Sequence, residues 1–253
     1  MDHFSNYQRT VGLLTILAGL LSAACLLVGA IAVEFNFDAF SHPLLVLNYA
    51  HHYREAYWFL ILDMFGYYLL LLPAIFYLHH RFKFHSPWVP LLTFCGVAYV
   101  LTGALGSAML AATWPHMMQQ YLGATGMDAE PIARLFEVAT LTVTQGMWNL
   151  LEVVYAAVWW IGFGILMYRQ YRWTATVGML TGVACFIDHV GNLLAIGWLA
   201  DAGLNLYLAL SIVWPIMLGI RLMRGAGHRV ARTMDPASER ADTPALAPKP
   251  FYQ

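Results

Sequence analysis

Three polar side chains interrupt an otherwise apolar stretch near the end of the chain. Asp188, His189 and Asn192 lie inside a run that extends over residues 173–199. If that run crosses a bilayer, the three groups lie in hydrocarbon, where ionisable side chains are costly and face a cavity, a partner or a ligand rather than lipid. We therefore expect a functional site here.

Two further apolar stretches carry carboxyl groups at a similar depth. Asp63 lies within the stretch 57–78, and Glu152 lies within the stretch 145–168. If each stretch is a helix that rises 1.5 Å per residue, Asp63, Glu152 and Asp188 lie about 9 to 16 Å below the same membrane surface. Three helices thus bring polar groups into the outer half of the bilayer.

The spacing of the polar residues places them on two helix faces. Residues three, four or seven positions apart share one face of an α-helix. One predicted stripe consists of Gln145, Asn149 and Glu152, and the other of Asp188 and Asn192 with His189 at its edge. A group that faces lipid finds no hydrogen-bond partner, so both stripes should face the bundle interior. This predicts a polar pocket built from the second, fourth and fifth spans.

The composition sets the class of protein. Hydrophobic residues make up 60% of the 253 residues, charged residues make up 11%, and the mean hydropathy is +0.61. A soluble domain carries about 25% charged residues. Apolar runs of about 20 residues recur, and that length spans the hydrocarbon core. We predict an all-α, polytopic transmembrane bundle, and no feature indicates a nucleic-acid partner.

Six spans account for the apolar runs. They are predicted at residues 11–33, 57–78, 88–113, 145–168, 173–199 and 202–223, within a bundle of residues 1–224. Loops are predicted at 34–56 and 114–134, and an amphipathic lead at 131–144 precedes the fourth span. Residues 225–253 are too polar and too rich in proline to bury a core, which predicts a disordered tail.

The positions of the cations predict the orientation. Lysine and arginine accumulate in cytoplasmic loops. With the N-terminus inside, the outer segments hold Arg54 and Arg134, and the inner segments hold Arg9, Arg81, Lys83, Arg169, Arg172, Arg221, Arg224, Arg229, Arg232, Arg240 and Lys249. We therefore expect both termini in the cytoplasm of a bacterial cell, with the bundle in its inner membrane.

One interpretation of the polar residues is a metal site. Carboxylates combined with imidazole suit zinc, iron or manganese. The predicted ligands are Asp63, Glu152, Asp188 and His189, with His51, His52, Glu55 or His116 added from the outer loops. A bound metal would activate water or carry out redox chemistry on a lipid-soluble substrate.

Two other interpretations need no metal. In the first, Asp63, Glu152 and Asp188 exchange protons beside His189 in a proton-coupled transporter. In the second, the protein is a binding or assembly subunit that holds a lipid-soluble molecule, membrane lipids, a second copy of itself or a partner helix. In either interpretation, the amides of Gln145, Asn149 and Asn192 would form hydrogen bonds between helices.

Two cofactors are disfavoured by residue positions. His189 is the only histidine deep inside a predicted span, so no second axial ligand for a transmembrane haem is present. Lys83 and Lys249 are the only lysines and both lie outside the spans, so no residue can form a Schiff base with retinal.

The opening of the first span carries a resemblance to a known group of proteins. The segment Arg9-Thr10-Val11-Gly12-Leu13-Leu14 resembles the start of the first span in uncharacterised six-span bacterial integral membrane proteins. The resemblance covers the span pattern of residues 9–224. It implies a six-span bundle and assigns no activity and no site residue.

Overall fold

The described part of the chain is built from helices. The computed structural model describes residues 3–233, and every regular element within that range is helical. This confirms the predicted all-α class.

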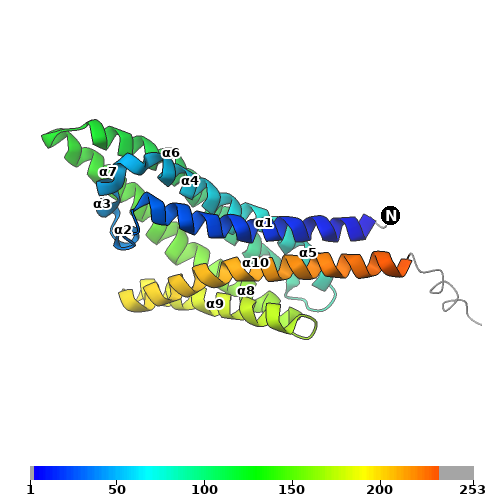
Figure 1. The fold of residues 1–253 in the computed structure, drawn as a ribbon. Coiled ribbons are helices and arrows are strands. Elements are labelled where there is room, and N and C mark those ends of the chain that lie inside the picture. The colour runs from blue at the N-terminus through cyan, green and yellow to red at the C-terminus, as the bar shows by residue number, and fades with distance from the viewer. Residues whose placement is uncertain (1–2, 234–253) are drawn as a thin grey trace, which may run out of the picture.

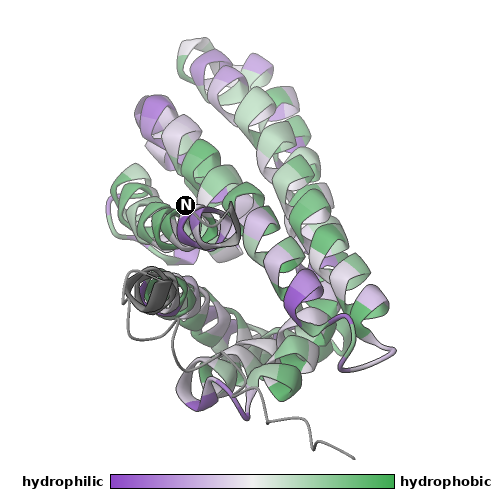
Figure 2. Ribbon diagram, turned by 90° about the vertical axis from the view of Figure 1, so that its right-hand side faces the viewer, coloured by the Kyte–Doolittle hydropathy of each residue, from purple (hydrophilic) through white to green (hydrophobic). Residues whose placement is uncertain are grey.

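Six helical stretches are long and apolar enough to cross a membrane, which confirms the predicted number. Within the described residues they are Ser5–Ala32, Pro43–Phe82, Val89–Gly123, Gly126–Met167, Arg172–Leu193 and Gly197–Gly225. Hydrophobic positions cover most of each helix, and hydrophilic positions gather at several helix ends (Figure 2).

Two of the six stretches are composed of several elements. The first, third, fifth and sixth are mainly single helices: α1 (His3–Ala32), α6 (Val89–Gly123), α9 (Arg172–Leu193) and α10 (Gly197–Thr233). The second follows the short helix α2 (Asp38–Ser41) and comprises α3 (Pro43–Val46), η1 (Leu47–His52), α4 (Tyr53–Asp63), η2 (Met64–Tyr68), η3 (Leu69–Leu71) and α5 (Leu72–Phe82). The fourth comprises η4 (Gly126–Asp128), α7 (Ala129–Leu141), η5 (Thr142–Glu152) and α8 (Val153–Met167).

The third and fourth spans are longer than predicted. Residues 114–123, predicted as a loop, continue α6, and α7 runs into η5 without a break at residue 145. The reason is packing between the two helices: the rings of Trp114 and Phe136 stack with centroids 5.2 Å apart, and Trp114 Nε1 donates a hydrogen bond to Thr140 Oγ1 over 2.8 Å. A helical hairpin thereby buries apolar residues that a loop would expose.

The fifth and sixth spans also differ from the prediction at their ends. Helix α9 ends at Leu193, and Ala195 takes a left-handed φ of 54° in the short turn before α10. Helix α10 continues to Thr233, so the first part of the predicted tail at 225–253 is helical. The rest of that tail, residues 234–253, lies outside the described residues.

The helices run back and forth along one axis, as Figure 1 shows. Helix α1 begins and α10 ends at the same end of the bundle, and the connections α5–α6 and α8–α9 lie there too. The opposite end carries α2, α3, and the α6–α7 and α9–α10 connections. The core between the helices holds large buried rings, among them Tyr99, Trp159, Trp160 and Trp214.

Candidate functional site

Two π-helical segments interrupt the second and fourth spans at the residues of interest. Asp63 is the last residue of α4 and directly precedes η2, which ends at Tyr68. The second π-helical segment, η5, ends at Glu152. π-helical turns inside α-helices are frequent at functional sites. Both segments end on a residue whose side chain enters the same hydrogen-bond network.

That network, here called the Glu152 network, joins four spans. Glu152 is 1% exposed. The Tyr68 hydroxyl lies 3.0 Å from its Oε2, and the Tyr207 hydroxyl lies 3.3 Å from its Oε1. The Tyr99 hydroxyl lies 3.2 Å from the Tyr207 hydroxyl and donates to the Tyr67 carbonyl over 2.7 Å. The carboxyl group of Glu152 thus contacts hydroxyl groups of the second and sixth spans directly, and Tyr207 connects it to the hydroxyl of Tyr99 on the third span.

The number of hydrogens in the network indicates which protonation state of Glu152 satisfies every contact. The four contacts each require one hydrogen, and the tyrosine hydroxyls supply three. Tyr207 donates to Glu152 if the acid is ionised, which leaves the Tyr99–Tyr207 contact without a hydrogen because Tyr99 donates to a carbonyl; if the acid is neutral it can donate to Tyr207, which then donates to Tyr99. A neutral Glu152 donates to Tyr207 and accepts from Tyr68. All four contacts are then satisfied, as a buried polar network requires.

Asp63 forms a second buried contact beside this network. Ser107 Oγ lies 2.6 Å from Asp63 Oδ2 and 2.9 Å from the Gly103 carbonyl oxygen. The same carbonyl accepts a hydrogen bond from Trp148 Nε1 over 3.3 Å. A Cβ atom on Gly103 would overlap the ring of Tyr68, so the glycine provides the space that this ring occupies. Asp63 and Glu152 therefore adjoin a common stretch of α6.

Asp188 lies in a different contact, between α9 and α10. It is fully buried, and its Oδ1 accepts a hydrogen bond from Asn192 Nδ2 over 2.7 Å. Its other oxygen, Oδ2, has no hydrogen-bond partner among the described residues. Gly203 of α10 packs on its backbone, since a Cβ there would lie 2.7 Å from Asp188 Cα. No hydrogen bond joins Asp188 to Glu152 in the described structure.

The predicted stripe on the fourth span is wrong. Gln145 is exposed and Asn149 is partly buried, whereas Glu152 is buried. The physical reason is η5, which covers all three residues. A π-helix bonds i to i+5 and has more residues per turn than an α-helix, so positions seven apart no longer share a face.

The predicted stripe on the fifth span is closer to the structure. Asp188 and Asn192 share a face and are hydrogen-bonded, as their spacing predicts. His189 is partly buried, and its Nδ1 has no hydrogen-bond partner among the described residues.

The predicted metal-ligand set is not assembled. Among the described residues, the group of histidine, cysteine and acidic side chains with ligand atoms close enough to share an ion is Glu34, His51 and His52. This group lies between the end of α1 and the beginning of α4, and it includes none of Asp63, Glu152, Asp188 and His189. Of the other predicted loop ligands, Glu55 contacts His52 over 3.6 Å, and His116 lies 3.0 Å from Gln120.

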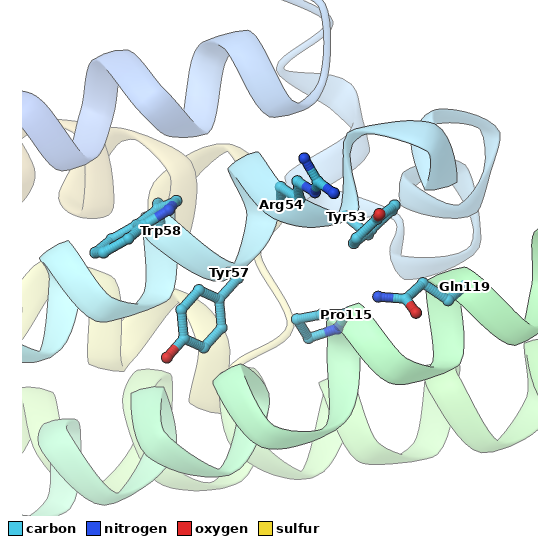
Figure 3. A pocket seen from close by; sticks show the side chains of 6 residues that line it. All are labelled: Tyr53, Arg54, Tyr57, Trp58, Pro115 and Gln119. Carbon is cyan, nitrogen blue, oxygen red and sulfur yellow. The ribbon is translucent and has the colours of Figure 1, made fainter.

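A shallow notch lies on the surface near the beginning of α4. It has a volume of about 210 Å³ and is lined by Tyr53, Arg54, Tyr57 and Trp58 of α4 and by Pro115 and Gln119 of α6 (Figure 3). None of the polar residues predicted to form the pocket lines it. The space around Glu152 is occupied instead by tyrosine rings.

Sequence reasoning missed the partners of the carboxyl groups: Tyr68, Tyr99, Tyr207 and Ser107. Part of the signal was available, because Tyr68 and Tyr99 lie near the middle of their predicted spans, 57–78 and 88–113, rather than at the ends, where aromatic belts occur. A buried tyrosine hydroxyl usually has a hydrogen-bond partner. Deep tyrosines on several spans therefore indicate a shared buried acceptor.

Comparisons with protein-family models, curated proteins and solved structures return no match for this chain. A functional conclusion therefore has to come from the geometry. Within the described residues, the Glu152 network draws on more spans than the contacts of Asp63 or Asp188 do.

Proposed function

We propose that this is a multi-pass protein of a bacterial inner membrane, with both termini in the cytoplasm, in which Glu152 binds and releases a proton inside the helix bundle. The observation that carries the proposal is the hydrogen count: three hydroxyl hydrogens serve four contacts, and a hydrogen on the Glu152 carboxyl group would supply the fourth. Loss of that proton breaks one contact and leaves a charge in the interior.

The surroundings of Glu152 support an acid that changes protonation. No lysine or arginine forms an ion pair with it in the described residues. An isolated buried charge is expensive, so the neutral form is favoured at rest. Asp63 and Asp188 are two further buried acids of the described spans. These features favour the proton-relay interpretation over a metal site at the same residues.

The distribution of cations supports the proposed orientation. Among the lysines and arginines whose side chains are described, Arg54 and Arg134 lie near the end that carries α2 and α3. The other described lysines and arginines lie on elements near the opposite end, where α1 begins and α10 ends. An excess of cations marks the cytoplasmic side.

Infrared spectroscopy of the full chain in liposomes tests the proposal. A protonated carboxyl group has a C=O stretch that shifts in D2O and is lost on ionisation. We expect such a band to fall reversibly as the pH rises in the wild type and to be weaker in Glu152→Gln, in which the other buried acids, Asp63 and Asp188, are still present. Glu130→Gln, which changes an exposed acid, should leave the band intact. A band that is the same in wild type and Glu152→Gln would contradict the proposal.

Proton movement is measured separately. Proteoliposomes that enclose a pH-sensitive dye should acidify under an imposed pH gradient with wild-type protein, and more slowly with Glu152→Gln. An equal rate for both proteins would show that Glu152 does not exchange its proton across the bundle.

A second candidate function is the binding of a small lipid-soluble ligand. It is favoured by two buried atoms that lack hydrogen-bond partners in the described structure, Asp188 Oδ2 and His189 Nδ1. A ligand that both donates and accepts hydrogen bonds would satisfy them. Mass spectrometry of organic extracts of the purified protein should then detect a co-purified molecule that is lost in Asp188→Asn. Identical extracts would remove this candidate.

A further inference from the structure

A separate cluster lies outside the bundle, where the first span ends. Helix α1 ends at Ala32, and Glu34 and Phe35 both take left-handed φ values, 50° and 61°. Such values are uncommon for residues other than glycine. The Phe35 backbone N–H donates to the Ala30 carbonyl over 2.7 Å, which holds this turn against the helix end. The turn directs the Glu34 side chain toward the start of the second span.

Two adjacent histidines meet Glu34 there. The Nε2 atom of His51 lies 3.1 Å from Glu34 Oε1, and the Nε2 atom of His52 lies 3.3 Å from the same oxygen. The two imidazole rings have centroids 4.2 Å apart. The three ligand atoms all lie within 4.8 Å of one another. Two imidazoles from consecutive residues thus converge on one carboxylate.

These separations suit ligands that share a tetrahedral metal ion. With bonds of about 2.0 to 2.1 Å, ligand atoms around a tetrahedral zinc lie about 3.3 Å apart. Two histidines and one glutamate are a known zinc-ligand set that leaves a fourth position open for water. Glu34 and His51 have side chains that are more than half exposed, so water has access.

His52 also has a carboxylate near its second ring nitrogen. Its Nδ1 lies 3.6 Å from Glu55 Oε2, while its Nε2 faces Glu34. Metal-ligating histidines commonly direct their second nitrogen to a carboxylate, which fixes the tautomer and the ring orientation.

The nearest cation of the loop is engaged elsewhere. The guanidinium of Arg54 lies 5.7 Å from the centre of the Tyr53 ring. In the described ion pairs, the partners of Glu34 are the two histidines, with no lysine or arginine among them. The carboxylate thus keeps its charge available for a cation.

We propose that Glu34, His51 and His52 bind one divalent transition-metal ion of the zinc class. The ion would join the end of the first span to the beginning of the second, across the loop that contains α2 and α3. This site is independent of the Glu152 network, because the two share no residue.

Zinc titration of the purified full chain tests the site. The protein carries a purification tag that contains no histidine, and a chelator first removes any bound metal. Binding of Zn²⁺ alone is then measured by calorimetry in detergent. We expect one ion per chain in the wild type. His51→Ala and His52→Ala should each weaken binding at least ~100-fold, and Glu55→Gln about 10- to 100-fold.

His116→Ala is the matched control, because it removes another exposed histidine near the same end of the bundle. It should leave binding unchanged. Absence of zinc binding in the wild type, or equal weakening by His116→Ala and His51→Ala, would overturn the proposal.

Two further measurements separate the outcomes. X-ray absorption of the zinc-loaded wild type should show two imidazole ligands, and a spectrum with none would also overturn the proposal. Glu152→Gln should bind zinc as the wild type does, because the Glu152 network lies elsewhere. Weakened binding in that variant would contradict the independence of the two sites.

Discussion

Glu152 and Glu34 are the same side chain in opposite surroundings. Glu152 is 1% exposed and contacts tyrosine hydroxyls, whereas Glu34 is more than half exposed and contacts two imidazoles. In the interior, a charge has no solvent to stabilise it, so the carboxyl group needs hydrogens arranged to satisfy a neutral acid. At the surface, water stabilises the charge and leaves the oxygens available to a cation. Solvent access, rather than residue type, separates the two roles.

The largest effect should come from Glu152→Ala. It removes the common partner of Tyr68 and Tyr207 and leaves a cavity among buried rings. We expect the free energy of unfolding to fall by about 4 kcal/mol, from unpaired hydroxyls and lost packing together. Unfolding by sodium dodecyl sulfate in mixed micelles, followed by tryptophan fluorescence, measures this.

Glu152→Gln sharpens the same test. Its amide can donate to Tyr207 and accept from Tyr68, as a neutral acid does. We expect a loss below about 1 kcal/mol, because a replacement of similar shape preserves the network. If Gln is as destabilising as Ala, the acid is charged in the folded protein and the contrast with Glu34 fails.

The next largest effect should come from Gly103→Ala. The added methyl group would overlap the Tyr68 ring, which then has to move away from Glu152. Overpacking of this kind costs about 1 to 3 kcal/mol. Gly146→Ala is the control, because nothing lies within 4 Å of its Cβ position. Equal thermal stability of the two variants would show that the Tyr68 position does not depend on Gly103.

A smaller loss is expected from Tyr207→Phe. The change deletes one hydroxyl and leaves both Glu152 and Tyr99 short of a partner, which costs about 1 to 2 kcal/mol. Tyr155→Phe is the comparison, since Tyr155 is partly buried and lies outside the Glu152 network. The same unfolding assay distinguishes the two, and a larger loss for Tyr155→Phe would indicate that the network contributes little to stability.

Glu34→Gln should have the smallest effect in the absence of metal. Ion pairs at an exposed surface contribute at most about 1 kcal/mol. Saturating zinc should raise the melting temperature of the wild type, because an ion that binds the folded state stabilises it. The increase should be smaller for Glu34→Gln. A large loss without zinc would show that Glu34 is a structural residue and not primarily a ligand.

The predicted spans succeeded where local properties decide the structure. Most of the run 173–199 forms the helix α9, Arg172–Leu193, because helical backbone hydrogen bonds are local and a length of about 20 residues suits a bilayer. The spacing of Asp188 and Asn192 predicted their shared face because α9 is a regular helix. The same spacing rule failed for Gln145 and Glu152, because η5 changes the number of residues per turn.

The loop prediction at 114–134 failed for a related reason. Trp114 has no partner nearby in the sequence, and its burial depends on Phe136 and Thr140 across a helical hairpin. Only packing between the two helices reveals that these residues extend the spans rather than connect them.

The sequence by itself determined that the chain folds into six apolar helices and that Asp63, Glu152 and Asp188 lie within them. Both follow from the hydrophobicity of short segments. Only the tertiary structure decided the partners of these acids. Glu152 contacts Tyr68 and Tyr207, which are 84 and 55 positions away along the chain, and Tyr99 reaches Tyr207 across 108 positions. Contacts over such separations arise when helices pack, because a hydroxyl can satisfy a buried carboxyl only within hydrogen-bond distance.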